Sequence, residues 1–508
     1  MPIDEAMRVE IDLSGSADIV AEPDLHARVG RALLAMKALE RGAIANETEG
    51  RMVGHYWLRD PSIAPTADIE SAIRSAIVDV ESFARLIRAG EIRGADGPFE
   101  RVVHIGIGGS TLGPQFVASA LNRQRGIEFV FLDNADPHSL ELVLRDGKTR
   151  LGRTLVSVVS KSGVTPTPEW LWHEVAHEFQ AHGIPFPRHA VATTCPGSPL
   201  YEKATAQGWL ATFPVWDWVG GRTSVTSSVG LLPAALAGLD VPAFLKGAAA
   251  MDVRTRRLTI ATNPSAALAA IWFSLATSEQ CRLIAVLPYS DRLALFPRYL
   301  QQLMMESLGK RRTRHGTDVT HAFTVFGGKG SSDQHSYVQQ LLDGPDDVFV
   351  VIVAVRSPAP TLGGARGEPL SDLLYGYREG FRRTLSARGR RSVTITLPDV
   401  SEHSLGALVA LFERAVGLYG ELIDVNAYDQ PAIDKFAAAP ILELQVRVLD
   451  YLAATVEPAS VDVIAHGIGA GDSAELRRVL DHLVFDVPRR LERTWSADGE
   501  RFTIPAGS

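Results

Sequence analysis

The sequence predicts an α/β protein with two α/β units in tandem and helical segments at both ends. Short β-branched runs end in small polar residues and are each followed by a helical pattern, the alternation typical of βα units. These runs form two groups, separated by a more helical stretch from about 224 to 278. The length of 508 residues and the apolar fraction of 46% allow two large domains or three smaller ones.

Each part of the chain has its own pattern. Up to about residue 98, apolar residues recur at spacings of three and four, which predicts helices. The first group of strands is predicted at 102–106, 129–133, 155–160 and 189–193, and the second at 282–288, 323–327, 347–355 and 392–397. The last part is amphipathic and charged, which predicts a small helical appendage. We therefore divide the chain into segments 1–98, 99–245, 246–280, 281–450 and 451–508.

Composition excludes several classes of protein. Lys and Arg number 51 against 59 Asp and Glu, a net charge of -8, so no overall basic field favours nucleic acid. The longest apolar stretches, 348–355 and 266–276, fall short of the roughly 18 residues that a membrane span needs. The first residues are acidic, unlike a signal peptide, and the two cysteines, Cys195 and Cys281, suit a reducing compartment. These features predict a cytoplasmic protein.

A glycine-rich turn at 102–114 is the first candidate binding site. A predicted strand ends in glycines that include Gly109, and Ser110 then opens a helix. Glycines let a ligand approach the backbone closely, and free amides at a helix start can hold a phosphate. The turn is neither a Walker loop nor a clean GxGxxG motif. A tight strand-to-helix connection without a ligand is the alternative.

A second turn of the same kind strengthens the phosphate hypothesis. The strand at 155–160 ends in Ser160, and Lys161, Ser162 and Thr165 precede the next helix. The hydroxyls of the two turns, together with backbone amides, are enough to hold a phosphate without a metal or a basic patch. Helix capping by Ser and Thr is the alternative.

Other polar residues could complete such a site. Arg222 follows two glycines among small residues, where a guanidinium could reach into a cleft. Gln302 and Glu306 lie four apart on a predicted helix that begins near Pro297, so they share one face. His335 follows a glycine-rich loop, and Lys435 follows a turn with proline. For each of them the alternative is an ordinary surface or capping residue.

Six motifs in colinear order strongly resemble the glucose-6-phosphate isomerase (phosphoglucose isomerase) family, most closely its cyanobacterial and plastid branch. They are IGIGGSTLGP, SKSGVT, WDWVGGRTSVTSSVGL, FPRYLQQLMMESLGK, GGKGSSDQHSYVQQL and GALVALFERAVGLYGELIDVNAYDQP. The resemblance implies two SIS-type domains, each a doubly wound parallel sheet between helices. It also implies a homodimer that interconverts glucose 6-phosphate and fructose 6-phosphate in glycolysis and gluconeogenesis, without a metal or cofactor.

The resemblance also implies a role for each matching residue. Phosphate-binding positions of the family fall on Ser110, Ser160, Ser162 and Thr165, and Gly109 and Lys161 of the same two turns are expected to bind substrate as well. Arg222, Glu306 and His335 match the family's active-site arginine, catalytic glutamate and catalytic histidine, the last supplied by the neighbouring subunit. Gln302 and Gln430 match its substrate glutamines, and Lys435 its catalytic lysine.

The chain departs from the family pattern at two places. QPAIDK is two residues shorter between the glutamine and the lysine, and Val164 and Thr167 replace a Thr and a Glu of the phosphate turn. The alternative functions are activity on mannose 6-phosphate as well, a sugar-phosphate sensor that has lost its chemistry, and a nucleotide-binding dehydrogenase. A sensor should lack Glu306 and His335, and a dehydrogenase needs an acidic residue that ends a second strand.

Overall fold

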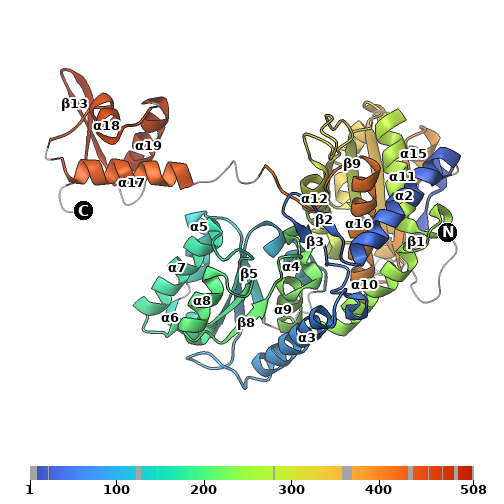
Figure 1. Ribbon diagram of the computed structural model, residues 1–508, viewed down its shortest axis with the longest axis horizontal. Helices are drawn as coiled ribbons and strands as arrows, with labels where there is room; N and C mark the ends of the chain where they lie inside the picture. Colours follow the sequence, from blue (N-terminus) through green and yellow to red (C-terminus); the bar gives the residue numbers. More distant parts are fainter. Residues whose placement is uncertain are drawn as a thin grey trace. The chain divides into compact units, whose positions relative to one another are not determined.

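Five parallel strands form the first sheet of the computed structural model, in the order β5-β4-β6-β7-β8 (Figure 1). The strands are β4 (Arg101–Ile105), β5 (Glu128–Leu132), β6 (Thr154–Val159), β7 (Ala190–Thr194) and β8 (Ala211–Pro214). The four strands predicted for this region are confirmed. The short edge strand β8 was not predicted, because its sequence ATFP has neither length nor strong alternation.

Helices cover both faces of the first sheet. Alternate strand residues point to opposite sides, so that Val102, Leu155 and Val191 join one apolar core and Val103, Val156 and Ala192 another. The second core is closed by α5 (Pro137–Leu144), α7 (Pro166–Ala181) and α8 (Pro199–Ala206), and α6 (Gly147–Leu151) leads into β6. The first core includes residues of α3 (Ala67–Arg88), α4 (Leu112–Leu121) and α9 (Ser228–Leu236).

The second sheet has the order β1-β12-β11-β9-β10 and is parallel except for β1. Its strands are β9 (Leu283–Pro288), β10 (Thr324–Gly327), β11 (Val348–Val355), β12 (Ser392–Leu397) and the edge strand β1 (Glu10–Asp12). The four predicted strands are again confirmed. The N-terminal segment, predicted as helical, contributes β1 to this sheet, so the start of the chain pairs with β12.

Helices also flank the second sheet. One side carries α13 (Gly330–Asp333), α14 (Val338–Asp343) and α15 (Leu370–Ala387), and the other α11 (Pro264–Ser278), α12 (Phe296–Leu308) and α16 (Glu402–Leu422). Around α16 pack α2 (Pro23–Glu40) and α10 (Val241–Thr255) (Figure 1). The remaining short elements of this unit are α1 (Ala17–Val20), β2 (Ile44–Asn46) and β3 (Arg51–Met52). Two flanked parallel sheets confirm the predicted fold class.

Aromatic rings join the two sheet regions. Phe116 of α4 lies 5.3 Å from Phe296 and 5.7 Å from Tyr299 of α12, measured between ring centroids. Phe296 in turn lies 5.4 Å from Phe412 of α16. All four rings are buried, so both sheets share one apolar core.

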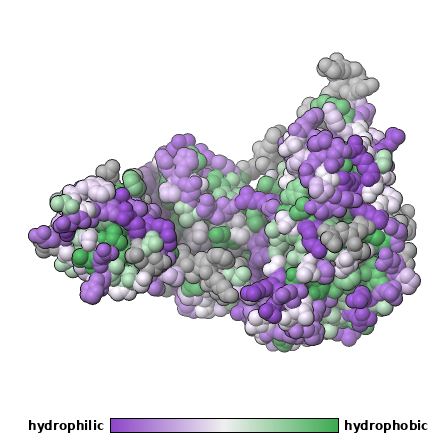
Figure 2. Space-filling model, turned by 90° about the horizontal axis from the view of Figure 1, so that it is seen from above, coloured by the Kyte–Doolittle hydropathy of each residue, from purple (hydrophilic) through white to green (hydrophobic). Residues whose placement is uncertain are grey.

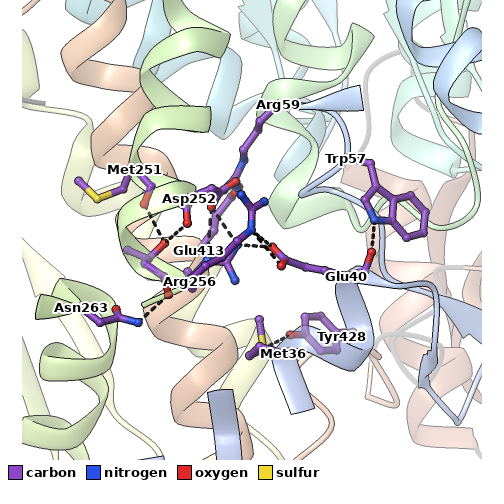
Figure 3. Close-up of polar contacts among 12 residues, drawn as sticks. Met36, Glu40, Trp57, Arg59, Met251, Asp252, Arg256, Asn263, Glu413 and Tyr428 are labelled. Carbon is purple, nitrogen blue, oxygen red and sulfur yellow. Dashed lines mark hydrogen bonds and ion pairs between the residues drawn. The ribbon is translucent and has the colours of Figure 1, made fainter. Parts of the chain in front are cut away.

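A network of buried ion pairs lies among α2, α10 and α16 (Figure 3). Arg59 Nη1 donates to both carboxylate oxygens of Asp252, at 2.9 and 3.0 Å, and Arg59 also pairs with Glu413. Arg414 pairs with Glu40 and, at 3.1 Å, with Asp252. Since each buried charge faces an opposite one, the network ties the N-terminal segment to the helices of the second half.

The chain divides into two compact units, Met1–Asp429 and Gln430–Ser508. The described residues are 9–20, 22–121, 127–145, 147–278, 281–356, 369–432, 439–455, 457–471, 473–485 and 490–505. The second unit has its own core, built from α17 (Ala439–Ala453), α18 (Val461–Ile468), α19 (Ser473–Phe485) and the hairpin β13 (Glu492–Ser496) and β14 (Gly499–Thr503). Helix α17 thus spans the predicted boundary at 450.

The hairpin corrects the expectation that the C-terminal appendage is helical. Its strands pair antiparallel around a turn that contains Asp498 and Gly499, residues that favour tight turns. The strands carry charged residues on both sides of Trp495, which hid the alternation expected of a strand.

No helix in the described part of the chain is long and apolar enough to cross a membrane. Hydrophilic and hydrophobic residues are interspersed over the face shown in Figure 2.

Candidate active site

Helix α12 presents Gln302 and Glu306 together, as their spacing predicted. Its apolar stripe is buried, through Leu300, Leu303 and Met304 among others. Gln302 Nε2 donates a hydrogen bond of 2.8 Å to Glu306 Oε2, and the Glu306 side chain keeps 19% of its surface exposed. The carboxylate is therefore fixed by its neighbour one turn away while solvent or a ligand can still reach it.

Arg222 reaches this carboxylate from the 3₁₀ helix η5 (Gly221–Thr226). Its side chain is buried, and its Nε lies 3.6 Å from Glu306 Oε1. Nη2 donates to the backbone oxygen of Asp429 at 2.9 Å, and Nη1 lies 3.5 Å from Ser307 Oγ. Burial lowers the pKa of Arg222, opposed by the carboxylates of Glu306 and Asp429. The guanidinium is thus held beside the carboxylate as a buried cation.

Two glycine turns meet directly beside this pair. A Cβ at Gly109 would lie 2.0 Å from the backbone oxygen of Gly221, so only glycine allows η3 (Gly108–Ser110) to approach η5. Gly108 has φ +58, and a Cβ there would meet Gln302 Nε2 at 3.0 Å. Ser224 Oγ donates to the backbone oxygens of Gly109 and Gly221, at 3.3 and 2.7 Å. The first glycine turn therefore borders both Arg222 and Gln302.

His104 contacts the backbone of the first turn. Its Nε2 lies 2.8 Å from the backbone oxygen of Ser110, and burial lowers the pKa of His104 to about 4. A neutral ring protonated at Nε2 donates to this oxygen, which fixes the path of the backbone at Ser110. No pattern in the sequence predicted a role for His104.

The second turn forms a cluster of hydroxyl groups at the start of α7. Ser160 Oγ donates to Thr165 Oγ1 at 3.1 Å, and Ser162 Oγ lies 3.3 Å from the same atom. The amides of Gly163 and Val164 donate to Ser160 Oγ and Ser162 Oγ. Thr165 is the N-cap residue, but its side chain makes no capping hydrogen bond. The hydroxyls thus gather at a helix N-terminus, an arrangement suited to an anion.

Lys161 of the same turn is bonded to the protein backbone. Its Nζ donates to the backbone oxygens of Asp217 and Val219, both at 2.7 Å. Burial lowers the pKa of Lys161, and the charge of Arg51 acts in the same direction. Lys161 therefore fastens the loop that leads to Arg222 onto the second turn.

Three of the predicted residues remain, namely His335, Gln430 and Lys435. His335 follows α13 and is exposed, and its ring centroid lies 6.5 Å from that of Tyr377 in α15. Within the described residues, no hydrogen bond or ion pair joins it to Glu306 or Arg222. Gln430 begins the second compact unit. Lys435 lies outside the described residues.

Two charged residues in the cluster were not predicted. Lys310 Nζ donates to the backbone oxygens of Glu306 and Asp429, at 2.8 and 3.0 Å, and lies 3.4 Å from Asp429 Oδ1. Lys310 stands four residues after Glu306, a spacing that could have revealed it. Asp429 is 119 positions away from Lys310 in the chain, so no local pattern could have shown that contact. Among the described residues, no group of three or more His, Cys, Asp or Glu could hold a metal ion.

Comparisons with known proteins agree on one family. The model of the family "Phosphoglucose isomerase" matches residues 27–359. A glucose-6-phosphate isomerase of Synechococcus sp. (strain JA-3-3Ab) is 52% identical over 83% of this chain and 81% of its own. One from Thermosynechococcus vestitus is 47% identical over 89% and 87%. These relatives are cyanobacterial, as the motifs indicated.

Solved structures give the same result. The crystal structure of a glucose-6-phosphate isomerase from Chlamydia trachomatis matches with a TM-score of 0.78 and 26% identity, over 87% of this chain and 92% of that one. A hypothetical protein from Thermus thermophilus matches with a TM-score of 0.71 and 28% identity, over 86% and 99%. The similarity thus extends from the sequence to the whole arrangement of the two sheets.

Proposed function

The chain belongs to the phosphoglucose isomerase family, and from this premise we propose that it interconverts glucose 6-phosphate and fructose 6-phosphate with Glu306 as the base. The observation that carries this assignment is the partly exposed Glu306 carboxylate, held by Gln302 at 2.8 Å and faced by the buried Arg222 at 3.6 Å. A base beside a fixed cation is what proton transfer through an enediolate requires.

From glucose 6-phosphate to fructose 6-phosphate, the reaction moves one proton from C2 to C1 of the open-chain sugar, and the proton of the C2 hydroxyl group passes to the oxygen on C1. The Glu306 carboxylate takes the proton from C2 of glucose 6-phosphate and returns it to C1, which yields fructose 6-phosphate. Negative charge builds up on the enediolate oxygens between these two events, and the Arg222 guanidinium stabilises it. The Gln302 amide keeps one carboxylate oxygen in place during both transfers.

The two hydroxyl-rich turns bind the phosphate of the substrate. Ser160, Ser162 and Thr165 offer hydroxyl donors at the N-terminus of α7, and Gly109 and Ser110 border Arg222 from the first turn. Lys161 adds positive charge nearby while it holds the Arg222 loop. Fixing the unreactive end of the sugar converts its binding energy into orientation of C1 and C2 over Glu306.

From the family resemblance we also propose that His335 and Lys435 act in ring opening and that Gln430 binds the sugar. His335 is exposed and makes no contact with Glu306 within the described chain, which supports its delivery to the active site of a second subunit. Next to it, α15 exposes Leu370, Leu373 and Tyr377, which line a pocket of about 290 Å³. An exposed apolar face of this kind suits an interface between copies. Size-exclusion chromatography with light scattering tests the homodimer.

A coupled assay tests the function. Purified protein receives fructose 6-phosphate, with EDTA present and glucose-6-phosphate dehydrogenase as the reporter. Robust turnover that is lost in Glu306→Gln supports the proposal. Binding of fructose 6-phosphate, seen as a raised melting temperature, without any turnover would favour a sensor instead. Mannose 6-phosphate in a parallel assay defines how strictly C2 is recognised.

The cytoplasm is the compartment that we propose, because both cysteines, Cys195 and Cys281, are free thiols. Cell fractionation with an antibody against the chain tests this assignment.

A further inference from the structure

Lys310 occupies a position in the active site to which the reaction described above gives no task. It follows the C-terminal end of α12, and only 6% of its side-chain surface is exposed. Its ammonium turns back and caps the backbone oxygen of Glu306, one of the carbonyls that a helix end leaves unpaired. Lys310 is therefore tied to the residue that we propose as the base.

The same ammonium also reaches the anchor of Arg222. The backbone oxygen of Asp429 accepts hydrogen bonds from Lys310 Nζ at 3.0 Å and from Arg222 Nη2 at 2.9 Å. Asp429 is held from its other side by Thr48 Oγ1, which donates to Oδ2 at 2.7 Å. One carbonyl oxygen thus links the cation that faces Glu306 to the ammonium that caps the Glu306 backbone.

We propose that Lys310 is a positioning residue for the isomerase reaction. It holds the Asp429 backbone and the end of α12, and this keeps the Arg222 guanidinium at a fixed distance from the Glu306 carboxylate. Its ammonium donates to protein oxygens of Glu306 and Asp429, which gives it no role in proton transfer to the sugar. Without the ammonium, Arg222 and Glu306 are both still present, but the distance between them is no longer fixed. This inference depends on the proposed function of Glu306 and Arg222.

The charge on Lys310 makes the positioning depend on pH. Burial lowers the pKa of Lys310 to about 8; the charge of Arg222 acts in the same direction, and Asp429 and Glu306 oppose it. Among the described residues, these three are the charged groups that act on the ammonium, and Glu49 and Tyr428 act on Arg222. As the pH rises through about 8, Lys310 loses its proton, its attraction to Asp429 weakens, and turnover falls.

The test compares Lys310→Met and Lys310→Arg with the wild-type enzyme across pH 6 to 10. In Lys310→Met we expect kcat to fall about 30-fold and KM to change less than about threefold, because the phosphate turns are untouched. The decline near pH 8 disappears in this variant, and in Lys310→Arg it moves beyond pH 10. Lys148→Met, at an exposed lysine of α6, is the matched control. A wild-type kcat in Lys310→Met would overturn the proposal.

A double variant separates positioning from stability. Lys310→Met leaves the buried Asp429 carboxylate without its cation, so the single variant is expected to melt earlier. Lys310→Met combined with Asp429→Asn removes that charge and should recover most of the melting temperature while kcat stays low. Recovery of kcat together with the melting temperature would show a purely structural role. An inactive wild-type enzyme would refute the proposed function itself, whereas active variants beside an active wild type refute only the role of Lys310.

Discussion

The first unit contains two clusters of buried charge, and they differ in how completely their charges are paired. In the network of Figure 3, Arg59 and Arg414 make close contacts with Asp252, Glu413 and Glu40. Tyr299 Oη adds a hydrogen bond of 3.0 Å to Glu413 Oε1.

The cluster around Glu306 is looser. Its ion pairs, Lys310 with Asp429 and Arg222 with Glu306, span 3.4 and 3.6 Å, and the Glu306 carboxylate keeps part of its surface exposed. Removing one partner from a closely paired, buried network destabilises a fold, whereas a partly exposed carboxylate beside a cation can exchange a proton. The difference distinguishes charges that hold the protein together from the charges that we propose for the reaction.

The largest effect should come from removing the reactive carboxylate. Glu306→Gln keeps the shape of the side chain and its hydrogen bond with Gln302 but cannot accept a proton. We expect kcat/KM to fall about 10⁴-fold, equivalent to about 5 kcal/mol in the barrier, with an unchanged melting temperature. The coupled assay and thermal unfolding measure both quantities. A fall of less than tenfold would remove Glu306 from the role of base.

The next effect should come from breaking the network of buried ion pairs around Arg59 and Arg414. Arg59→Met leaves Asp252 and Glu413 buried with too few cations, which should destabilise the protein by roughly 3 kcal/mol or more. Denaturant unfolding measures this loss, and kcat of the folded fraction should stay within about threefold of the wild type. If Arg59→Met had normal stability but little activity, the Arg59 network would serve catalysis rather than stability, which would contradict the comparison.

A smaller effect should follow when the backbone that positions Arg222 is pushed aside. Gly109→Ala places a methyl group against the Gly221 oxygen, and such overpacking costs about 1 to 3 kcal/mol. We expect a matching loss of stability in denaturant unfolding and a fall in kcat/KM of at least about tenfold. Gly221→Ala, whose Cβ meets nothing within 4 Å, is the stability control. Equal stability of the two variants would contradict the close approach of η3 and η5.

The smallest effect concerns the pH dependence of stability. His55 is buried beside the network, and burial, with the charges of Arg59 and Arg414, holds its pKa well below 6.5. In the unfolded chain His55 binds a proton near pH 6.5, whereas in the folded chain it does not. The free energy of unfolding therefore falls as the pH drops below 6.5, by at most about 1.4 kcal/mol per pH unit. Unfolding of His55→Phe should show a shallower dependence between pH 6.5 and 5. An identical slope would exclude His55 as its source.

Much of the fold follows from local patterns in the sequence. The eight predicted strands are apolar runs bounded by glycine or polar residues, and each becomes a strand of one of the two sheets. The missed strands β1 and β8 are short and lie at sheet edges, where one neighbour suffices and the pattern is weak. The pair Gln302 and Glu306 was predictable because one helical turn brings them together.

Contacts between distant segments could not be predicted in the same way. Arg414 and Glu40 lie 374 positions apart, and Arg222 and Asp429 lie 207 apart. Only the packing of α2, α10 and α16 and of the turn after α16 brings these charges together. The ion pairs of Arg59 and Arg414 and the hydrogen bonds of Lys310 therefore could not be predicted from local patterns, because they depend on the tertiary structure.

The most direct test of Glu306 as the base follows the transferred proton itself. Fructose 6-phosphate is incubated with the enzyme in D₂O, and NMR records deuterium at C1 of fructose 6-phosphate and C2 of glucose 6-phosphate. If the Glu306 carboxylate carries the proton, the wild-type enzyme incorporates deuterium during turnover and Glu306→Gln incorporates none above background. Incorporation by Glu306→Gln at the wild-type rate would show that another group is the base.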